Sequence, residues 1–72
     1  MQEVELANLL KRAVRNAPRR QIVVSIHLFG IRYAEALRWV SLPALVEAAG
    51  ISPSYATEIR KGMNLSDFVV LR

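Results

Sequence analysis

The side chains that could perform covalent chemistry are few, and their spacing matches no catalytic motif. The only histidine, His27, lies in an apolar stretch with neither a second histidine nor a carboxylate near it in sequence. The five serines form no nucleophile motif, and no glycine-rich phosphate loop or metal-ligand spacing is present. We therefore expect no catalytic residues, no metal, no cofactor and no enzymatic activity. We interpret His27 as a packed or surface residue.

Basic side chains offer a different kind of chemistry, the binding of an anionic partner. Residues 1–40 carry seven basic and three acidic side chains, whereas residues 41–72 carry three of each. This surplus fits a partner such as double-stranded DNA. The densest cluster is either a phosphate-contacting surface or, more commonly for such a run, a solvated helix face. The candidate phosphate contacts are Lys11, Arg12, Arg15, Arg19 and Arg20.

Length and composition limit the architecture that carries these residues. A chain of 72 residues is expected to be a single domain, 1–72, with a modest core that oligomerisation often supplements at this size. Without cysteine there are no disulfide bonds and no thiolate metal sites. No apolar run approaches the roughly 18 residues needed to span a bilayer, and the N-terminus has acidic residues where a secretory signal is basic. We expect a soluble, cytoplasmic protein with no membrane contact.

The first forty residues are predicted to contain two helices. Residues 3–16 repeat apolar side chains every three or four positions, and Asn16 and Pro18 supply a stop. The same spacing continues through residues 20–39, which we predict as one buried helix. There, Gly30 is a weak point that costs about 1 kcal/mol relative to alanine. Alternating Val and Ile residues leave a strand over residues 21–28 as the alternative.

Three aromatic residues lie within the second of these segments. Phe29 and Trp39 are interpreted as anchors of the core or of a dimer interface. Tyr33 is interpreted as a residue at the edge of the core whose hydroxyl reaches water.

The stretch from residue 41 to residue 62 contains two short helix patterns with the same start and stop signals. Ser41 is a suitable N-cap, followed by proline in the first turn, and Gly50 supplies the left-handed residue that ends the helix. Ser52 and Pro53 repeat this arrangement, and Gly62 is expected to end the second helix. A pair of short helices joined through a glycine is typical of the helix-turn-helix motif.

This stretch resembles the helix-turn-helix of the phage repressor and Cro family, also called the Xre family. The resemblance covers about 22 of the 72 residues and keeps the family's spacing without insertion or deletion. The matching features are Ser41, Leu45, Val46, Ala49, Gly50, Ile51, Ser52, Ile59 and Gly62.

The resemblance implies that the second helix enters the major groove of DNA. Ser54 and Tyr55 would then reach a base edge or a phosphate, and Glu58 would accept a hydrogen bond from a cytosine amino group. Arg60 and Lys61 would contact phosphate. The implied DNA-binding residues are Ser52, Pro53, Ser54, Tyr55, Glu58, Arg60 and Lys61.

Together these patterns predict an all-α fold, a small domain of four to five helices with a central helix-turn-helix. The helices are expected at about 3–16, 20–39, 42–49 and 53–61, and the tail at 66–71 is expected either to make one short turn or to be extended.

The predicted function is sequence-specific DNA binding by a transcriptional regulator that acts as a homodimer on an operator. The alternative is a protein-interaction module on a helix-turn-helix scaffold, such as an antiactivator that binds another regulatory protein. Three features favour this alternative. Residues 41–72 have no net charge, and neither Leu42 nor Pro53 has a side chain that could form a hydrogen bond to DNA.

Overall fold

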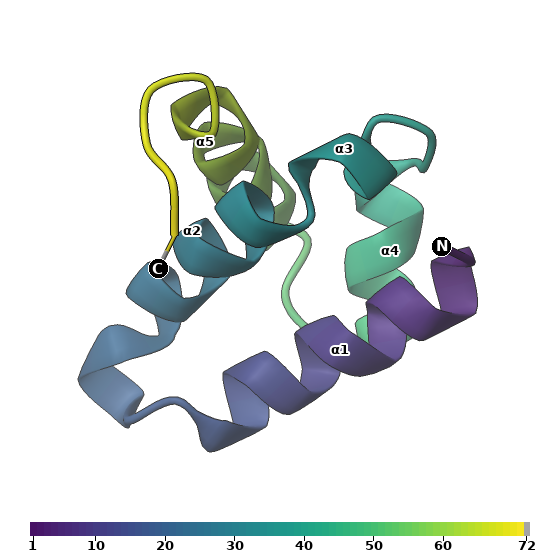
Figure 1. The fold of residues 1–72 in the computed structure, drawn as a ribbon. Coiled ribbons are helices and arrows are strands. Elements are labelled where there is room, and N and C mark those ends of the chain that lie inside the picture. Colours follow the sequence, from purple (N-terminus) through teal and green to yellow (C-terminus); the bar gives the residue numbers. More distant parts are fainter. Residues whose placement is uncertain (72) are drawn as a thin grey trace.

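The computed structural model describes residues 1–71 of the chain. Within this range it contains five α-helices and one short 3-10 helix (Figure 1). No strand occurs in this range, so the fold is all-α as predicted and residues 21–28 are helical. Arg72, one of the basic residues counted above, lies outside the described residues. In chain order the elements are α1 (Glu3–Asn16), η1 (Arg19–Gln21), α2 (Ile22–Arg32), α3 (Ala34–Leu37), α4 (Leu42–Ala49) and α5 (Tyr55–Leu65).

Helix α1 has the bounds that its sequence predicts. The Glu5 carboxylate accepts a hydrogen bond from the backbone N–H of Gln2 (3.3 Å), so the first turn is fixed by a local contact. Leu6, Ala7 and Leu10 are buried, and they face α4 and α2.

The single helix predicted over residues 20–39 is wrong, because the structure divides this segment. The chain leaves helical geometry at Tyr33 (φ −109°, ψ 20°), between α2 and the one-turn helix α3. In a continuous helix Leu37 would lie about 12 Å farther along the axis than Phe29. The break allows both side chains to enter one core, in which Phe29 is 4% and Leu37 1% exposed.

The three aromatic residues of this segment have different environments. Phe29 is part of the core, as predicted, and the Tyr33 ring is half-buried with its centroid 5.0 Å from that of Phe29. Trp39 is 83% exposed in the turn after α3, so its interpretation as a core anchor is wrong.

Helix α4 begins and ends where its punctuation predicts. The Ser41 hydroxyl accepts a hydrogen bond from the backbone N–H of Ala44 (3.3 Å), which satisfies one free donor of the first turn. Gly50 follows the helix with φ +74°, the left-handed conformation that glycine adopts without steric cost.

Helix α5 begins later and ends later than the predicted range 53–61. The turn over residues 52–54 is closed by the Tyr55 N–H donating to the Ser52 carbonyl (3.0 Å), and the α-helix starts at Tyr55. Gly62 does not end the helix, which continues to Leu65. It is instead a buried packing residue that faces Gly30 of α2.

Helix α2 lies between α1 and α5 and makes its most extensive contact with α5 (Figure 1). Where the two helices cross, the Cα atoms of Gly30 and Gly62 face each other without intervening side chains, so the backbones approach closely. The fully buried side chains of the core come from five helices and are Leu6, Leu10, Ile26, Leu37, Leu45, Val46 and Ile59.

The tail after α5 makes one turn and is then extended. The Phe68 N–H donates to the Leu65 carbonyl (2.9 Å), and no regular structure follows at residues 69–71. Figure 1 shows the extended part returning beside α2. No helix within residues 1–71 has both the length and the apolar character needed to cross a membrane.

Candidate nucleic-acid interface

Helices α4 and α5 form the helix-turn-helix unit, with Gly50 at the turn between them. Leu45 and Val46 of α4 and Ile59 of α5 are buried against the rest of the core. These contacts fix which face of α5 is turned inward. The opposite face of α5 is therefore held toward solvent.

Four polar residues occupy this outer face of α5. Thr57, Arg60, Lys61 and Asn64 are all exposed, and they recur at intervals of three or four over about two helical turns. They line one side of a shallow hollow of about 340 Å³, whose other side is the first turn of α4 with Pro43. We call these four residues the outer row.

The outer row is chemically suited to recognise nucleic acid. Arginine side chains donate two hydrogen bonds to guanine, and asparagine side chains make a matching pair with adenine. Lysine binds phosphate as a point charge, while threonine donates or accepts. Among residues 1–71 no acidic side chain lines the hollow, and no ion pair involves Arg60, so this guanidinium group makes the hollow positive.

The residues predicted at the start of this helix lie beside the outer row. Ser52, Pro53 and Ser54 are exposed in the turn that precedes α5. The Ser52 hydroxyl lies 3.0 Å from that of Ser54. Tyr55 is half-buried, and its ring packs against the core.

Glu58 lies between the outer row and α2 and contacts one residue of each. Its Oε1 atom lies 2.8 Å from Nε2 of His27, and its Oε2 accepts a hydrogen bond from Nζ of Lys61 (3.2 Å). The side chains of His27 and Glu58 are 29% and 22% exposed. A carboxylate with two partners of its own is poorly placed to accept a hydrogen bond from a base.

The two partners also alter the proton affinity of this carboxyl group. The hydrogen bond to His27, followed by that to Lys61, lowers the pKa of Glu58 below its ordinary value of 4.5. Across residues 1–71, no three histidine, aspartate or glutamate side chains gather in a way that could hold a metal ion. The His27–Glu58 pair is therefore best described as a contact between helices.

This contact predicts a pH-dependent contribution to stability. A carboxyl group whose pKa is lowered by folding stabilises the folded state above its ordinary pKa, 4.5, and loses that contribution as the pH falls through the lowered value. We expect Glu58→Gln to reduce the free energy of unfolding at neutral pH and to make little difference in acid. Urea unfolding of both proteins at pH values from about 3 to 7 measures this.

Glu35→Gln is the matched control for that experiment. The Glu35 side chain is 83% exposed, and among the described residues its one ion pair is with Arg38, at 3.8 Å. Its replacement should therefore change stability little at any pH. A difference between wild type and Glu58→Gln that stays constant over the whole pH range would contradict the role given to this carboxylate.

The basic cluster predicted to contact phosphate lies on a different surface from α5. All five residues are exposed, three on α1 and two in η1. Arg12 lines a pocket between α1 and α2, whereas Arg60 and Lys61 line the hollow between α4 and α5. Since α2 lies between α1 and α5 (Figure 1), the structure does not bring the basic cluster together with the outer row.

Thr57 and Asn64 are members of the outer row that the sequence analysis did not identify. The positions of Ala56 and Ile59, which form the inner face of the helix, could have indicated them. Residues half a turn away from that face must point outward. Asn64 also lay beyond the predicted end of the helix.

A model of the HTH-like domain family matches residues 2–72, almost the whole chain. No curated protein and no solved structure matches the chain.

Proposed function

The chain belongs to the HTH-like domain family, and from this premise we propose that it binds double-stranded DNA through α5 as a transcriptional regulator. The observation that carries the proposal is the outer row, four exposed polar side chains along about two turns of the second helix of the motif. Helix-turn-helix proteins place side chains of this helix against base edges in the major groove. The Ser41 cap and the left-handed Gly50 at the turn support a closer relation to phage repressors and Cro.

Each part of the outer row is assigned a role. Arg60 and Asn64 read base edges, because their side chains form two hydrogen bonds to guanine and adenine respectively. Thr57 and Lys61 contact the sugar-phosphate backbone of the DNA or an adjacent base. Ser52 and Ser54, exposed before the first turn of α5, bind phosphate and so fix the position of the helix on the duplex.

We further propose that two copies bind one operator. A pair of α5 helices would enter successive major grooves of a palindromic site, about 34 Å apart along the DNA axis. The exposed apolar side chains of the tail support a contact between copies, since Phe68 is 84% and Val70 92% exposed. Occupation of promoter DNA in the cytoplasm would then control transcription.

The expected result of removing the base-reading groups is a large loss of specific affinity. Arg60→Ala with Asn64→Ala should weaken binding by about a hundredfold, because each bidentate pair contributes about 1–3 kcal/mol of discrimination. The measurement is fluorescence anisotropy with labelled duplex from the gene's own upstream region, at several salt concentrations. Wild-type affinity should fall as salt rises, because phosphate contacts release counterions.

Arg19→Ala with Arg20→Ala is the control, since it removes two exposed cations that lie outside the hollow between α4 and α5. It should weaken binding to all sequences alike, by less than the outer-row variant does. Absence of a specific complex, or an affinity that does not depend on salt, would refute DNA binding.

A second candidate function is favoured by the tail rather than by α5. An antiactivator-like module would bind another regulatory protein through an exposed apolar surface, and Phe68, Val69 and Val70 form one in this chain. Under this hypothesis Phe68→Ala with Val70→Ala abolishes binding to the partner, and the outer-row variant has no effect.

A further inference from the structure

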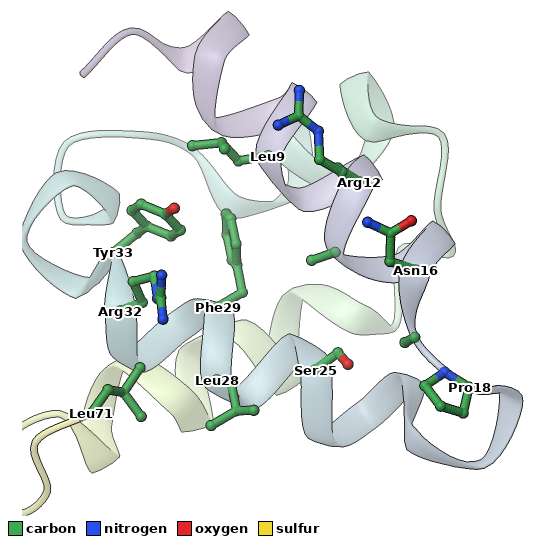
Figure 2. A pocket seen from close by; sticks show the side chains of 12 residues that line it. Leu9, Arg12, Asn16, Pro18, Ser25, Leu28, Phe29, Arg32, Tyr33 and Leu71 are labelled. Atoms are coloured by element: carbon green, nitrogen blue, oxygen red, sulfur yellow. The ribbon is translucent and has the colours of Figure 1, made fainter.

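A pocket of about 600 Å³ lies between α1 and α2, on the side of the molecule away from α5 (Figure 2). Leu9 and Ala13 of α1 line it on one side, Leu28 and Phe29 of α2 on the other, and Leu71 of the tail on its edge. The volume falls within the range of about 300–1,000 Å³ that is typical of small-molecule sites. Its lining is mostly apolar, as in such sites.

The charged side chains that line this pocket are both basic. Arg12 of α1 and Arg32 of α2 both line it, and no acidic side chain of residues 1–71 does. Among the described residues, neither arginine forms an ion pair. The guanidinium groups are thus free to bind an anion, and arginine pairs with a carboxylate through two parallel hydrogen bonds.

The shape of the pocket favours a small molecule over a helix from another protein. Pro18, in the connection between α1 and α2, lies at one end of the pocket, and Tyr33 lies at the other (Figure 2). A compact ligand fits between these two ends.

We propose that this pocket binds a small organic anion with an apolar body, such as a medium-chain or aromatic carboxylate. The apolar body lies against Leu9, Leu28 and Phe29. The carboxylate is held by Arg32, which lies beside Tyr33, and Arg12 adds positive charge from α1 (Figure 2). The site is separate from the outer row of α5, so its occupancy is measured without DNA. Failure to bind such a ligand would leave the proposed DNA binding untouched, and the reverse also holds.

The test uses octanoate and its neutral counterpart octanol as probes of the full chain. Titration is followed by proton–nitrogen correlation spectra, which also report whether the protein is folded. Octanoate should cause saturable shifts centred on Leu9, Ala13, Ser25 and Leu28. It should bind at least about tenfold more tightly than octanol, since charge-assisted hydrogen bonds exceed neutral ones.

Two matched variants assign the preference to the arginines of the pocket. Arg12→Gln with Arg32→Gln should lower the affinity for octanoate to that of octanol. Arg19→Gln with Arg20→Gln removes the same charge from η1, outside the pocket, and should preserve the preference.

Three outcomes would overturn the proposal. Equal affinity for octanoate and octanol would leave only non-specific apolar binding. If both double variants lost the preference for octanoate to the same extent, the preference would come from net charge and not from the arginines of the pocket. Shifts centred on Phe68–Val70 would place the bound molecule on the exposed tail instead of in the pocket.

Discussion

Gly62→Ala is expected to lower the free energy of unfolding by at least about 2 kcal/mol. A Cβ atom at this position would overlap the backbone carbonyl oxygen of His27 and lie 3.0 Å from the Cα of Gly30. Both neighbours belong to the backbone of α2, which cannot rotate away as a side chain can. The same collision occurs from the other side, because a Cβ on Gly30 would lie 2.5 Å from the carbonyl oxygen of Ile59.

The sign of this effect distinguishes packing from helix propensity. Gly62 lies inside α5, where alanine is favoured over glycine by about 1 kcal/mol when nothing obstructs it. Overpacking a close contact typically costs about 1–3 kcal/mol, and more where the neighbour is rigid. Packing should therefore outweigh propensity, and urea unfolding followed by far-UV circular dichroism measures the balance.

Asn64→Ala provides the comparison on the same helix. Asn64 is exposed, so its replacement tests propensity alone and should leave stability unchanged or slightly higher. If Gly62→Ala proved as stable as Asn64→Ala, the close crossing of α2 and α5 would be refuted.

Ile59→Ala is expected to cost about 2–5 kcal/mol, the range for removing a large buried aliphatic side chain. Ile59 is fully buried, and it belongs to the core that α5 shares with the other helices. A domain of this length has a total stability of about 4–11 kcal/mol. The variant should therefore be close to unfolding at room temperature, and thermal unfolding should show a fall in midpoint of about 10 °C or more.

Leu65→Ala is the matched control, because it removes an aliphatic side chain of similar size from the same helix. Leu65 is 43% exposed, so less apolar surface returns to water and no cavity forms. We expect a loss of under about 1 kcal/mol. Comparable losses in Ile59→Ala and Leu65→Ala would mean that α5 is not anchored through its inner face.

The parts of the fold that could be predicted are those with local causes. Helix α4 begins and ends as predicted because Ser41 caps it and Gly50 adopts a left-handed conformation, and both effects depend only on neighbours in sequence. Helix α1 was also predicted correctly, from its apolar periodicity and the stop at Asn16 and Pro18. Local hydrogen bonds and steric preferences are visible in a single sequence.

The errors arise where distant segments decide the local structure. No proline or capping residue marks the break at Tyr33 in the sequence. The break forms because Phe29 and Leu37 share one core. Gly62 was assigned to the end of a helix because glycine commonly stands there. Its actual role depends on Gly30, which is far away in sequence.

Only part of the candidate interface could be predicted from the sequence, and whether it binds DNA stays a prediction. The sequence placed the candidate residues on α5 and the turn before it, yet it did not show that Glu58 would meet His27 of α2, a partner 31 positions away. The outer row follows from which face of α5 is buried, and that face was only partly known. Only the packing of the helices therefore shows that Thr57 and Asn64 are exposed on the outer face of α5.

The exposure of Trp39 has a consequence for fluorescence. This is the only tryptophan in the chain, and the residue is already 83% exposed when the protein is folded. Its emission should change little on unfolding, which is why circular dichroism is the appropriate probe of stability. The same property makes Trp39 a sensitive reporter of association, because a second molecule that covers this turn would move the ring from water into an apolar environment.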